Sequence, residues 1–272
     1  MKGISVFRNY FQDFQDQYVL IGGAACDLIF EAQDTAFRAT KDLDIVLLVE
    51  ALTPDFGRKF WDFIKVGGYE HRAKSSGTPQ FYRFDRPTQP EFPYMLELFS
   101  RKGDIFENES VGPCVPIPLG DEVSSLSAIL LNEDYYALLL QGRTEIDGVS
   151  ILSPQYLIPF KAKAWLDLST RKQQGEQVDE KDIRKHKNDV ARLTTLLTGE
   201  EHCPLPPAIQ REMQAFFAHL EESPVDVKNL HLRGVHNEDI LQVLRSVYLS
   251  ADIVEESDFP SPYKKFSPGG LC

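Results

Sequence analysis

The fold is decided by one stretch of the chain, Arg38-Ala39-Thr40-Lys41-Asp42-Leu43-Asp44-Ile45-Val46-Leu47-Leu48-Val49. From Leu43 onward its residues are apolar and partly β-branched, a composition that is typical of a buried strand. Because side chains alternate across a strand, Asp42 and Asp44 are expected on the same face. Two neighbouring carboxylates repel each other and are costly to desolvate, and a bound divalent cation relieves both costs. Taken alone, the pair fits a structural role, with one Asp capping a turn and the other at a solvated strand end, as well as it fits a metal site.

A second feature lies upstream, where Gly22-Gly23 directly follows the apolar run from Tyr18 to Ile21. Glycines let the backbone approach a ligand closely, and the start of the following helix offers free N–H groups and a positive dipole end. Many strand-to-helix turns use glycine only for packing, so this motif alone leaves both interpretations open. Beside Asp42 and Asp44, it predicts a site for phosphate and magnesium.

A third acid, Glu97, interrupts the apolar stretch Tyr94-Met95-Leu96-Glu97-Leu98-Phe99. Buried acids are rare unless they are paired or bind a metal, whereas a solvent-facing position on an alternating strand needs no partner. On a strand next to Asp42 and Asp44, Glu97 would complete a three-carboxylate cluster. Such a cluster holds two Mg²⁺ ions about 3.5–4 Å apart, and Mn²⁺ is an alternative metal.

Composition narrows the class of protein. The chain has 272 residues, a formal net charge of −12, 42% hydrophobic residues and 26% charged residues. The acidic balance argues against nonspecific duplex binding, but it leaves room for a local basic patch that meets an RNA end or a nucleotide. No apolar run approaches the ~20 residues of a membrane span, and the N-terminal charges do not fit a signal peptide. The scattered cysteines predict reduced thiols in a cytoplasmic protein; they are Cys26, Cys114, Cys203 and Cys272.

The pattern of apolar residues predicts an α/β N-terminal half and a mainly helical C-terminal half. We place the first domain at residues 1–120, the helical domain at 121–258 and a loose tail at 259–272, with 103–120 as a sheet edge or domain seam. The predicted strands are 18–21, 43–49, 80–84, 94–99 and 148–152. The predicted helices are 4–16, 24–30, 53–66, 133–141, 153–172, 179–197, 206–221 and 236–250.

These motifs resemble the nucleotidyltransferase-fold superfamily of the polymerase-beta type. Its signature is a strand, Gly-Gly or Gly-Ser, a helix, a strand with Asp-x-Asp, and a later acid on another strand. The combination of Ile21-Gly22-Gly23 with Arg38-x-Thr40-x-Asp42-Leu43-Asp44 is similar to the AbiEii-type branch, which includes toxins of toxin–antitoxin and abortive-infection systems. The resemblance covers about residues 17–200. It implies a nucleoside triphosphate as substrate, magnesium as cofactor, and an antitoxin as a candidate partner.

The sequence departs from the family pattern in three places. The 18 residues from 24 to 41 make a long connection between Gly23 and Asp42. The glycine at position 23 replaces the serine that is common elsewhere, so we expect the hydroxyl contact to phosphate to be absent. Position 97 is Glu where Asp is also common, which changes the reach of the side chain and keeps the charge.

The resemblance also implies a lysine-bearing helix and a later helix rich in Lys and Asp. Lys161 and Lys163 lie two apart on one predicted helix, so they do not share a face, and we expect Lys161 to point into the cleft. A lysine there binds phosphate as a point charge, although a solvated lysine is the plain alternative. Asp189 could pair with Lys185 on the surface or orient Lys161 across the cleft. Arg38 and Thr40 are expected to contact phosphate or to fix the turn before Asp42.

The sequence thus predicts a metal-dependent nucleotidyltransferase that moves a nucleoside monophosphate from a triphosphate to a hydroxyl. Asp42, Asp44 and Glu97 would be the catalytic and metal-binding acids. The predicted nucleotide-binding residues are Gly22, Gly23, Arg38, Thr40, Lys161 and Asp189. The acceptor is an RNA end or a protein side chain, with a small molecule such as an aminoglycoside as the alternative, because an acidic surface suits a cationic acceptor. A non-catalytic nucleotide-binding regulator is the alternative from another class of protein.

Overall fold

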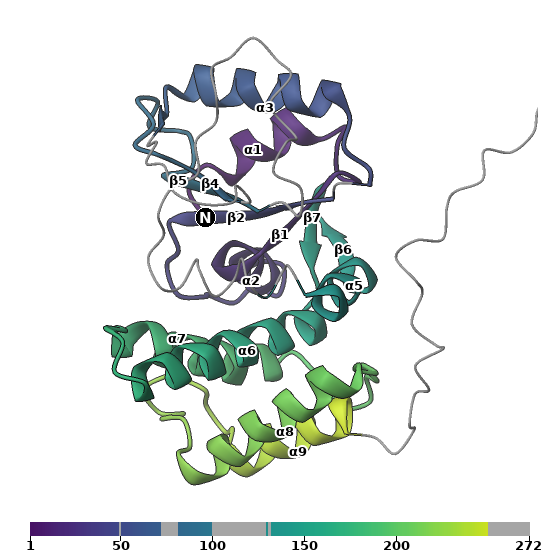
Figure 1. Cartoon of the computed structure of the whole chain (residues 1–272), viewed down its shortest axis with the longest axis vertical. Helices are drawn as coiled ribbons and strands as arrows, with labels where there is room; N and C mark the ends of the chain where they lie inside the picture. Colours follow the sequence, from purple (N-terminus) through teal and green to yellow (C-terminus); the bar gives the residue numbers. More distant parts are fainter. Residues whose placement is uncertain (49, 72–80, 100–128, 130–131, 250–272) are drawn as a thin grey trace, which may run out of the picture.

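The computed structural model describes residues 1–48, 50–71, 81–99, 129 and 132–249 (Figure 1). A mixed seven-stranded sheet is built by the N-terminal half together with a hairpin from residues 143–152, in the order β3-β4-β5-β2-β1-β7-β6. Its strands are β1 (Tyr18–Ile21), β2 (Asp42–Leu47), β3 (Glu70–His71), β4 (Phe81–Asp85), β5 (Met95–Phe99), β6 (Arg143–Ile146) and β7 (Val149–Leu152). Strand β2 runs parallel to β5, and β1 runs parallel to β7, while the other neighbouring strands are antiparallel. The predicted α/β fold class is confirmed.

Helices cover both faces of the sheet. Figure 1 shows α1 (Ile4–Phe11) and α3 (Pro54–Gly67) on one face and α2 (Gly22–Glu31) on the other. Strand β1 is apolar throughout and fully buried, as expected for a strand with both faces covered. Phe7 and Phe11 of α1 pack against Phe63 of α3, with ring centroids 6.0 and 5.4 Å apart. Each such buried ring contributes roughly 1.5–3 kcal/mol, so this aromatic layer fixes the sheet from the side opposite α2.

The C-terminal half is helical. It consists of α5 (Glu133–Gln141), α6 (Pro154–Gln173), α7 (Glu180–Thr194), α8 (Pro207–Glu222) and α9 (Asn237–Tyr248). Helix α6 packs against α7 and α8, and it also contacts α2, so it joins the helical half to the sheet (Figure 1). No helix within the described ranges has the length and apolar composition that crossing a membrane requires.

Several boundaries differ from the sequence prediction. Helix α2 begins at Gly22 itself, so no separate glycine turn precedes it, and α1 ends at Phe11 instead of residue 16. Strand β6 was not predicted, because its residues are mostly exposed and polar. The sheet also continues past the predicted domain boundary at residue 120, since β7 pairs with β1 through Leu20 and Ile151. The predicted seam at 103–120 and the tail at 259–272 lie outside the described residues.

Candidate active site

The sheet brings the three predicted acids together. Asp42 and Asp44 lie on β2, and Glu97 lies on β5 directly beside Asp44 in the parallel register. All three line one cavity of about 300 Å³ between the sheet, α2, α6 and α7. The expectation that Asp42 and Asp44 share a face is therefore confirmed, and Glu97 points into the same space.

Burial and mutual repulsion perturb these acids. Burial raises the pKa of Asp44 well above its usual range, and the nearby charges of Glu97 and Asp42 raise it further. The close contact between the Asp44 and Glu97 side chains adds to the rise in the pKa of Asp44. Burial also raises the pKa of Glu97, while Arg83 opposes that rise. Without a bound cation, the ionised form of Asp44 is therefore disfavoured.

Arg83 on β4 is a partner of Glu97 that the sequence prediction missed. Its Nε and Nη2 donate to the same carboxylate oxygen, Oε1 of Glu97, at 2.8 and 2.5 Å. Glu97 is only 5% exposed, so a lone charge there would be costly. The arginine compensates part of that charge and orients the carboxylate toward Asp44.

The three acids supply oxygen donors, the ligand type that Mg²⁺ and Mn²⁺ prefer. Among the described residues, no group of three or more His, Cys, Asp or Glu side chains is already arranged to hold a metal ion. Asp44 and Glu97 are in contact, with Asp42 two residues before Asp44 on the same face of β2. The donor chemistry fits a divalent cation held by Asp42 and Asp44 with Glu97 beside them, and such an ion would relieve the repulsion among these acids.

The two glycines are explained by how closely their neighbours approach. Gly22 has φ +66°, and a Cβ there would lie 1.8 Å from Oδ2 of Asp44. A Cβ at Gly23 would lie 2.6 Å from Oγ1 of Thr40. No side chain caps the start of α2, so the first turn of the helix is left open to an anion beside Thr40. The loss of a hydroxyl that we expected at position 23 is thus offset, because Thr40 places its own hydroxyl against Gly23.

Three other predicted residues form one ionic cluster. Asp189 on α7 is fully buried and accepts hydrogen bonds from Nε and Nη2 of Arg38 at 2.9 and 2.7 Å. It also accepts one from Nζ of Lys161 at 3.1 Å. Burial alone would raise the pKa of Asp189, but Lys161 and Arg38 outweigh burial and hold it well below its usual range. Burial lowers the pKa of Lys161, and Asp189 more than reverses that, so the lysine stays protonated.

This cluster corrects the role of Asp189. Arg38 and Lys161 line the cavity, whereas Asp189 lies behind them. Asp189 therefore orients the two cations, as the family resemblance allowed, and the alternative surface pairing with Lys185 is not what the structure shows. Lys163 points elsewhere, to Glu212 on α8 and Asp167, whereas Lys161 lines the cavity.

Several residues of the cavity were not predicted. Lys41 belongs to the Arg38–Asp44 motif, and it also lines the wall. Lys185 and His186 come from α7, and His186 precedes Asp189 by three residues, so the two lie on neighbouring parts of one helix face. That spacing could have indicated His186. The apolar part of the wall is formed by Leu157, Phe160 and Ala164 of α6.

No protein-family model matches the chain, and no curated protein sequence matches it. Among solved structures, it is similar to an antigenic nucleotidyltransferase-like protein from Paracoccidioides brasiliensis, with 20% identity, a TM-score of 0.42, and coverage of 84% of this chain and 89% of that one.

Two further solved structures carry related descriptions. A putative nucleotidyltransferase from H. pylori is 13% identical with a TM-score of 0.32, covering 89% of this chain and 90% of that one. The Megavirus polyadenylate synthase is 10% identical with a TM-score of 0.30, covering 83% of this chain and 50% of that one. These three solved structures are thus described as a nucleotidyltransferase-like protein, a putative nucleotidyltransferase and a polyadenylate synthase.

Proposed function

We propose that this chain is a metal-dependent nucleotidyltransferase. The observation that supports this best is the meeting of three carboxylates, an open helix start and a set of cations in one cavity. The carboxylates alone would repel a triphosphate, and the cations alone would bind any phosphate. Together they suit a triphosphate that arrives with a divalent cation.

Each part of the cavity has a task in binding the nucleotide. The first turn of α2 and the Thr40 hydroxyl donate hydrogen bonds to phosphate oxygens. Lys161 and Arg38 add positive charge, and Asp189 holds both in place. The apolar wall of α6, which includes Phe160, offers a surface for the base.

Transfer then requires an acceptor hydroxyl beside Glu97. The hydroxyl oxygen attacks the α-phosphorus, a new P–O bond forms, and the bond to the bridging oxygen of the departing pyrophosphate breaks. The hydroxyl proton passes to the carboxylate of Glu97, which Arg83 keeps oriented. The bound metal would supply charge stabilisation for the attacking and leaving oxygens.

The paired substitution Asp42→Asn/Asp44→Asn tests this function. We expect Mg²⁺-dependent binding of nucleoside triphosphates to be lost, and transfer of label from an α-³²P-labelled triphosphate to fall by about a thousandfold or more. Asp55→Asn, an exposed change on α3, is the control. If the double variant binds the triphosphate with the same magnesium dependence as the wild type, the proposal is wrong, and a non-catalytic regulator becomes the better account.

We extend the proposal to the AbiEii-type toxin branch on the strength of the Arg38-x-Thr40-x-Asp42-Leu43-Asp44 motif. The ion pair between Arg38 and Asp189 supports it, because it gives the motif's arginine a partner in the later helix. Induced expression in a bacterial host should slow growth, and Asp42→Asn/Asp44→Asn should abolish the effect. If cells that express the wild type and cells that express the double variant grow equally well, the assignment to the toxin branch is wrong, and so is the antitoxin partner. The proposal of nucleotidyl transfer would still stand.

A further inference from the structure

A second cavity adjoins the nucleotide cavity. Its volume is about 480 Å³, and its wall shares Thr40 and Lys41 with the first cavity. Three of its lining side chains are cationic, namely Lys2, Lys41 and Arg86, and Tyr94 provides an aromatic ring. The sequence prediction assigned no role to Lys2, Arg86 or Tyr94.

The sheet places this cavity next to the acids. Asp42 lies opposite Met95 in the parallel register of β2 and β5, so Lys41 and Tyr94 are neighbours at the start of the two strands. The Nζ of Lys41 lies 5.6 Å from the centroid of the Tyr94 ring. Tyr94 directly precedes β5, and Glu97 lies on that strand. The second cavity meets the nucleotide cavity at Thr40 and Lys41, and Lys41 directly precedes the acid Asp42.

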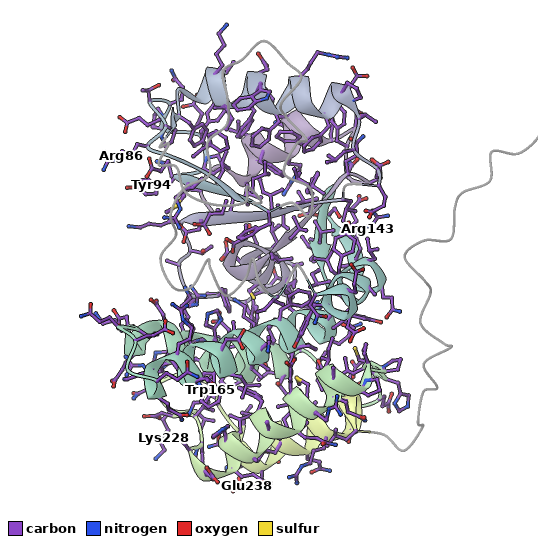
Figure 2. All side chains as sticks on the ribbon, viewed as in Figure 1. Arg86, Tyr94, Arg143, Trp165, Lys228 and Glu238 are labelled. Atoms are coloured by element: carbon purple, nitrogen blue, oxygen red, sulfur yellow. The ribbon has the colours of Figure 1, made fainter. Side chains whose placement is uncertain are left out.

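Tyr94 is unusual for a large side chain beside a cleft, because it is 49% exposed. An exposed ring with a lysine above it is a ready platform for a flat group, since each base has a π-face and each nucleotide brings a phosphate. Figure 2 shows Arg86 and Tyr94 close together at one side of the N-terminal half. Arg86 is itself more than half exposed, and its pair with Glu70 is long, at 3.5 Å.

We infer that this second cavity binds the acceptor, and that the acceptor is the 3′ end of a single-stranded nucleic acid. This inference rests on the proposed nucleotidyl transfer. Three cations gather here although the chain as a whole carries a net charge of −12, so the local charge is opposite to the overall one. A polyanionic strand fits that charge, whereas a cationic aminoglycoside would be repelled. A hydroxyl on a folded protein would need neither three cations nor a stacking ring.

The order of the β-strands gives the nucleic acid a direct route to the catalytic acids. In the order β4-β5-β2-β1, the nucleotide cavity lies toward β1 and α2, and the acceptor cavity lies toward β5 and β4. The two cavities meet at Thr40 and Lys41, and the acids of β2 and β5 line the nucleotide cavity. The terminal 3′-oxygen would attack the α-phosphorus and form a phosphodiester, pyrophosphate would leave, and the 3′-hydroxyl proton would pass to Glu97.

Binding of a short labelled RNA tests the inference. The probe is a 5′-fluorescein single-stranded RNA of ten nucleotides with a free 3′-hydroxyl, followed by fluorescence anisotropy at several salt concentrations. We expect Tyr94→Ala to weaken binding about tenfold or more, and Tyr94→Phe to keep it, because stacking needs only the ring. Lys41→Gln and Arg86→Gln should each weaken binding and reduce the salt slope by about 0.7.

The control is Arg143→Gln, which removes the same charge as Arg86→Gln at the other end of the sheet (Figure 2). It should leave RNA binding unchanged. Because Tyr94 is half exposed, its substitution should not disturb folding, and Mg²⁺-dependent triphosphate binding by Tyr94→Ala should match the wild type.

The outcomes separate this inference from the proposed function. If the wild type does not bind the RNA, or if Tyr94→Ala and Arg86→Gln bind it as well as Arg143→Gln does, the acceptor assignment is wrong. Transfer of label to a protein or an aminoglycoside in place of RNA would overturn it too, while leaving nucleotidyl transfer intact. If the Asp42→Asn/Asp44→Asn variant instead binds the nucleotide with the same magnesium dependence as the wild type, the proposed function itself is wrong.

Discussion

Two ionic clusters adjoin the same cavity, and they differ in how their charges are balanced. In the first, Asp42, Asp44 and Glu97 face one another, and Arg83 compensates only part of their charge. In the second, the buried carboxylate of Asp189 is held by Arg38 and Lys161. Burial is the largest single influence on the pKa of both Asp44 and Asp189, yet the pKa of Asp44 is raised, whereas Lys161 and Arg38 together lower that of Asp189.

The difference separates a charge that the fold satisfies from one that it leaves for a ligand. A buried ion with well-placed partners belongs to the structure, and its removal exposes those partners to the cost of burial. A group of acids whose pKa values are raised by burial and by each other stores an unfavourable interaction that a cation would relieve. The two clusters therefore respond to substitution in opposite directions.

The largest expected effect is on the satisfied cluster. Asp189→Ala should lower the free energy of unfolding by about 3–5 kcal/mol, because it leaves Lys161 and Arg38 without their shared anion. Urea denaturation at pH 7 measures this. Glu180→Gln, at the exposed start of the same helix, should lower the free energy of unfolding far less, because solvent screens its ion pair with Lys172. Similar losses for both variants would mean that Asp189 is no more important than a surface charge.

In the cluster of Asp42, Asp44 and Glu97, removal of a charge should change the free energy of unfolding in the opposite direction. In metal-free protein at pH 7, Asp44→Asn should raise the free energy of unfolding by about 1 kcal/mol or more, since it removes a buried repelling charge. The folded pKa of Asp44 is raised, so its penalty is present at neutral pH and disappears as the pH falls and the carboxyl takes up a proton.

The gain from Asp44→Asn should therefore shrink between pH 7 and pH 5, as measured by urea denaturation in the presence of a chelator. Asp55→Asn on α3 changes a mostly exposed carboxyl and should show no such trend. A loss of stability on Asp44→Asn would place Asp44 among the satisfied charges and would erase the contrast between the clusters.

The smallest expected effect concerns the hydroxyl that lies between the two cavities. Thr40→Val keeps the shape of the side chain and removes one hydrogen bond to phosphate, so it should weaken Mg²⁺–triphosphate binding about five- to tenfold. Thr40→Ser should bind as the wild type does. Isothermal titration of the three proteins gives the comparison, and equal affinities for Thr40→Val and Thr40→Ser would show that the hydroxyl does not reach the nucleotide.

The local elements were largely predictable from the sequence. Strand β1 and helices α3 and α5 fall close to the predicted ranges, because an apolar run, a Thr53 cap with Pro54, and an Asn132 cap mark their starts. The acids on β2 and β5 could be placed on one side because strand alternation needs no tertiary information.

What the sequence could not supply were the contacts between distant segments. Nothing local indicates that Arg83 on β4 lies beside Glu97, or that Thr40 covers Gly23. The need for some partner of Glu97 was evident from its apolar surroundings, but its identity depends on the strand register. The second cavity depends likewise on Lys2 and Arg86 coming to the same place from far apart in the chain.

The ion pair between Arg38 and Asp189 also has a consequence for biosynthesis. The two residues are 151 positions apart, so at about 5–20 residues per second the ribosome makes Asp189 roughly 8–30 s after Arg38. Near the end of that interval the nascent chain carries Asp42, Asp44, Glu97 and Lys161, but it still lacks the anion that positions Arg38 and Lys161. The nucleotide cavity is therefore completed late in translation, and a product truncated before α7 would have every acid of the site without its arranged cations.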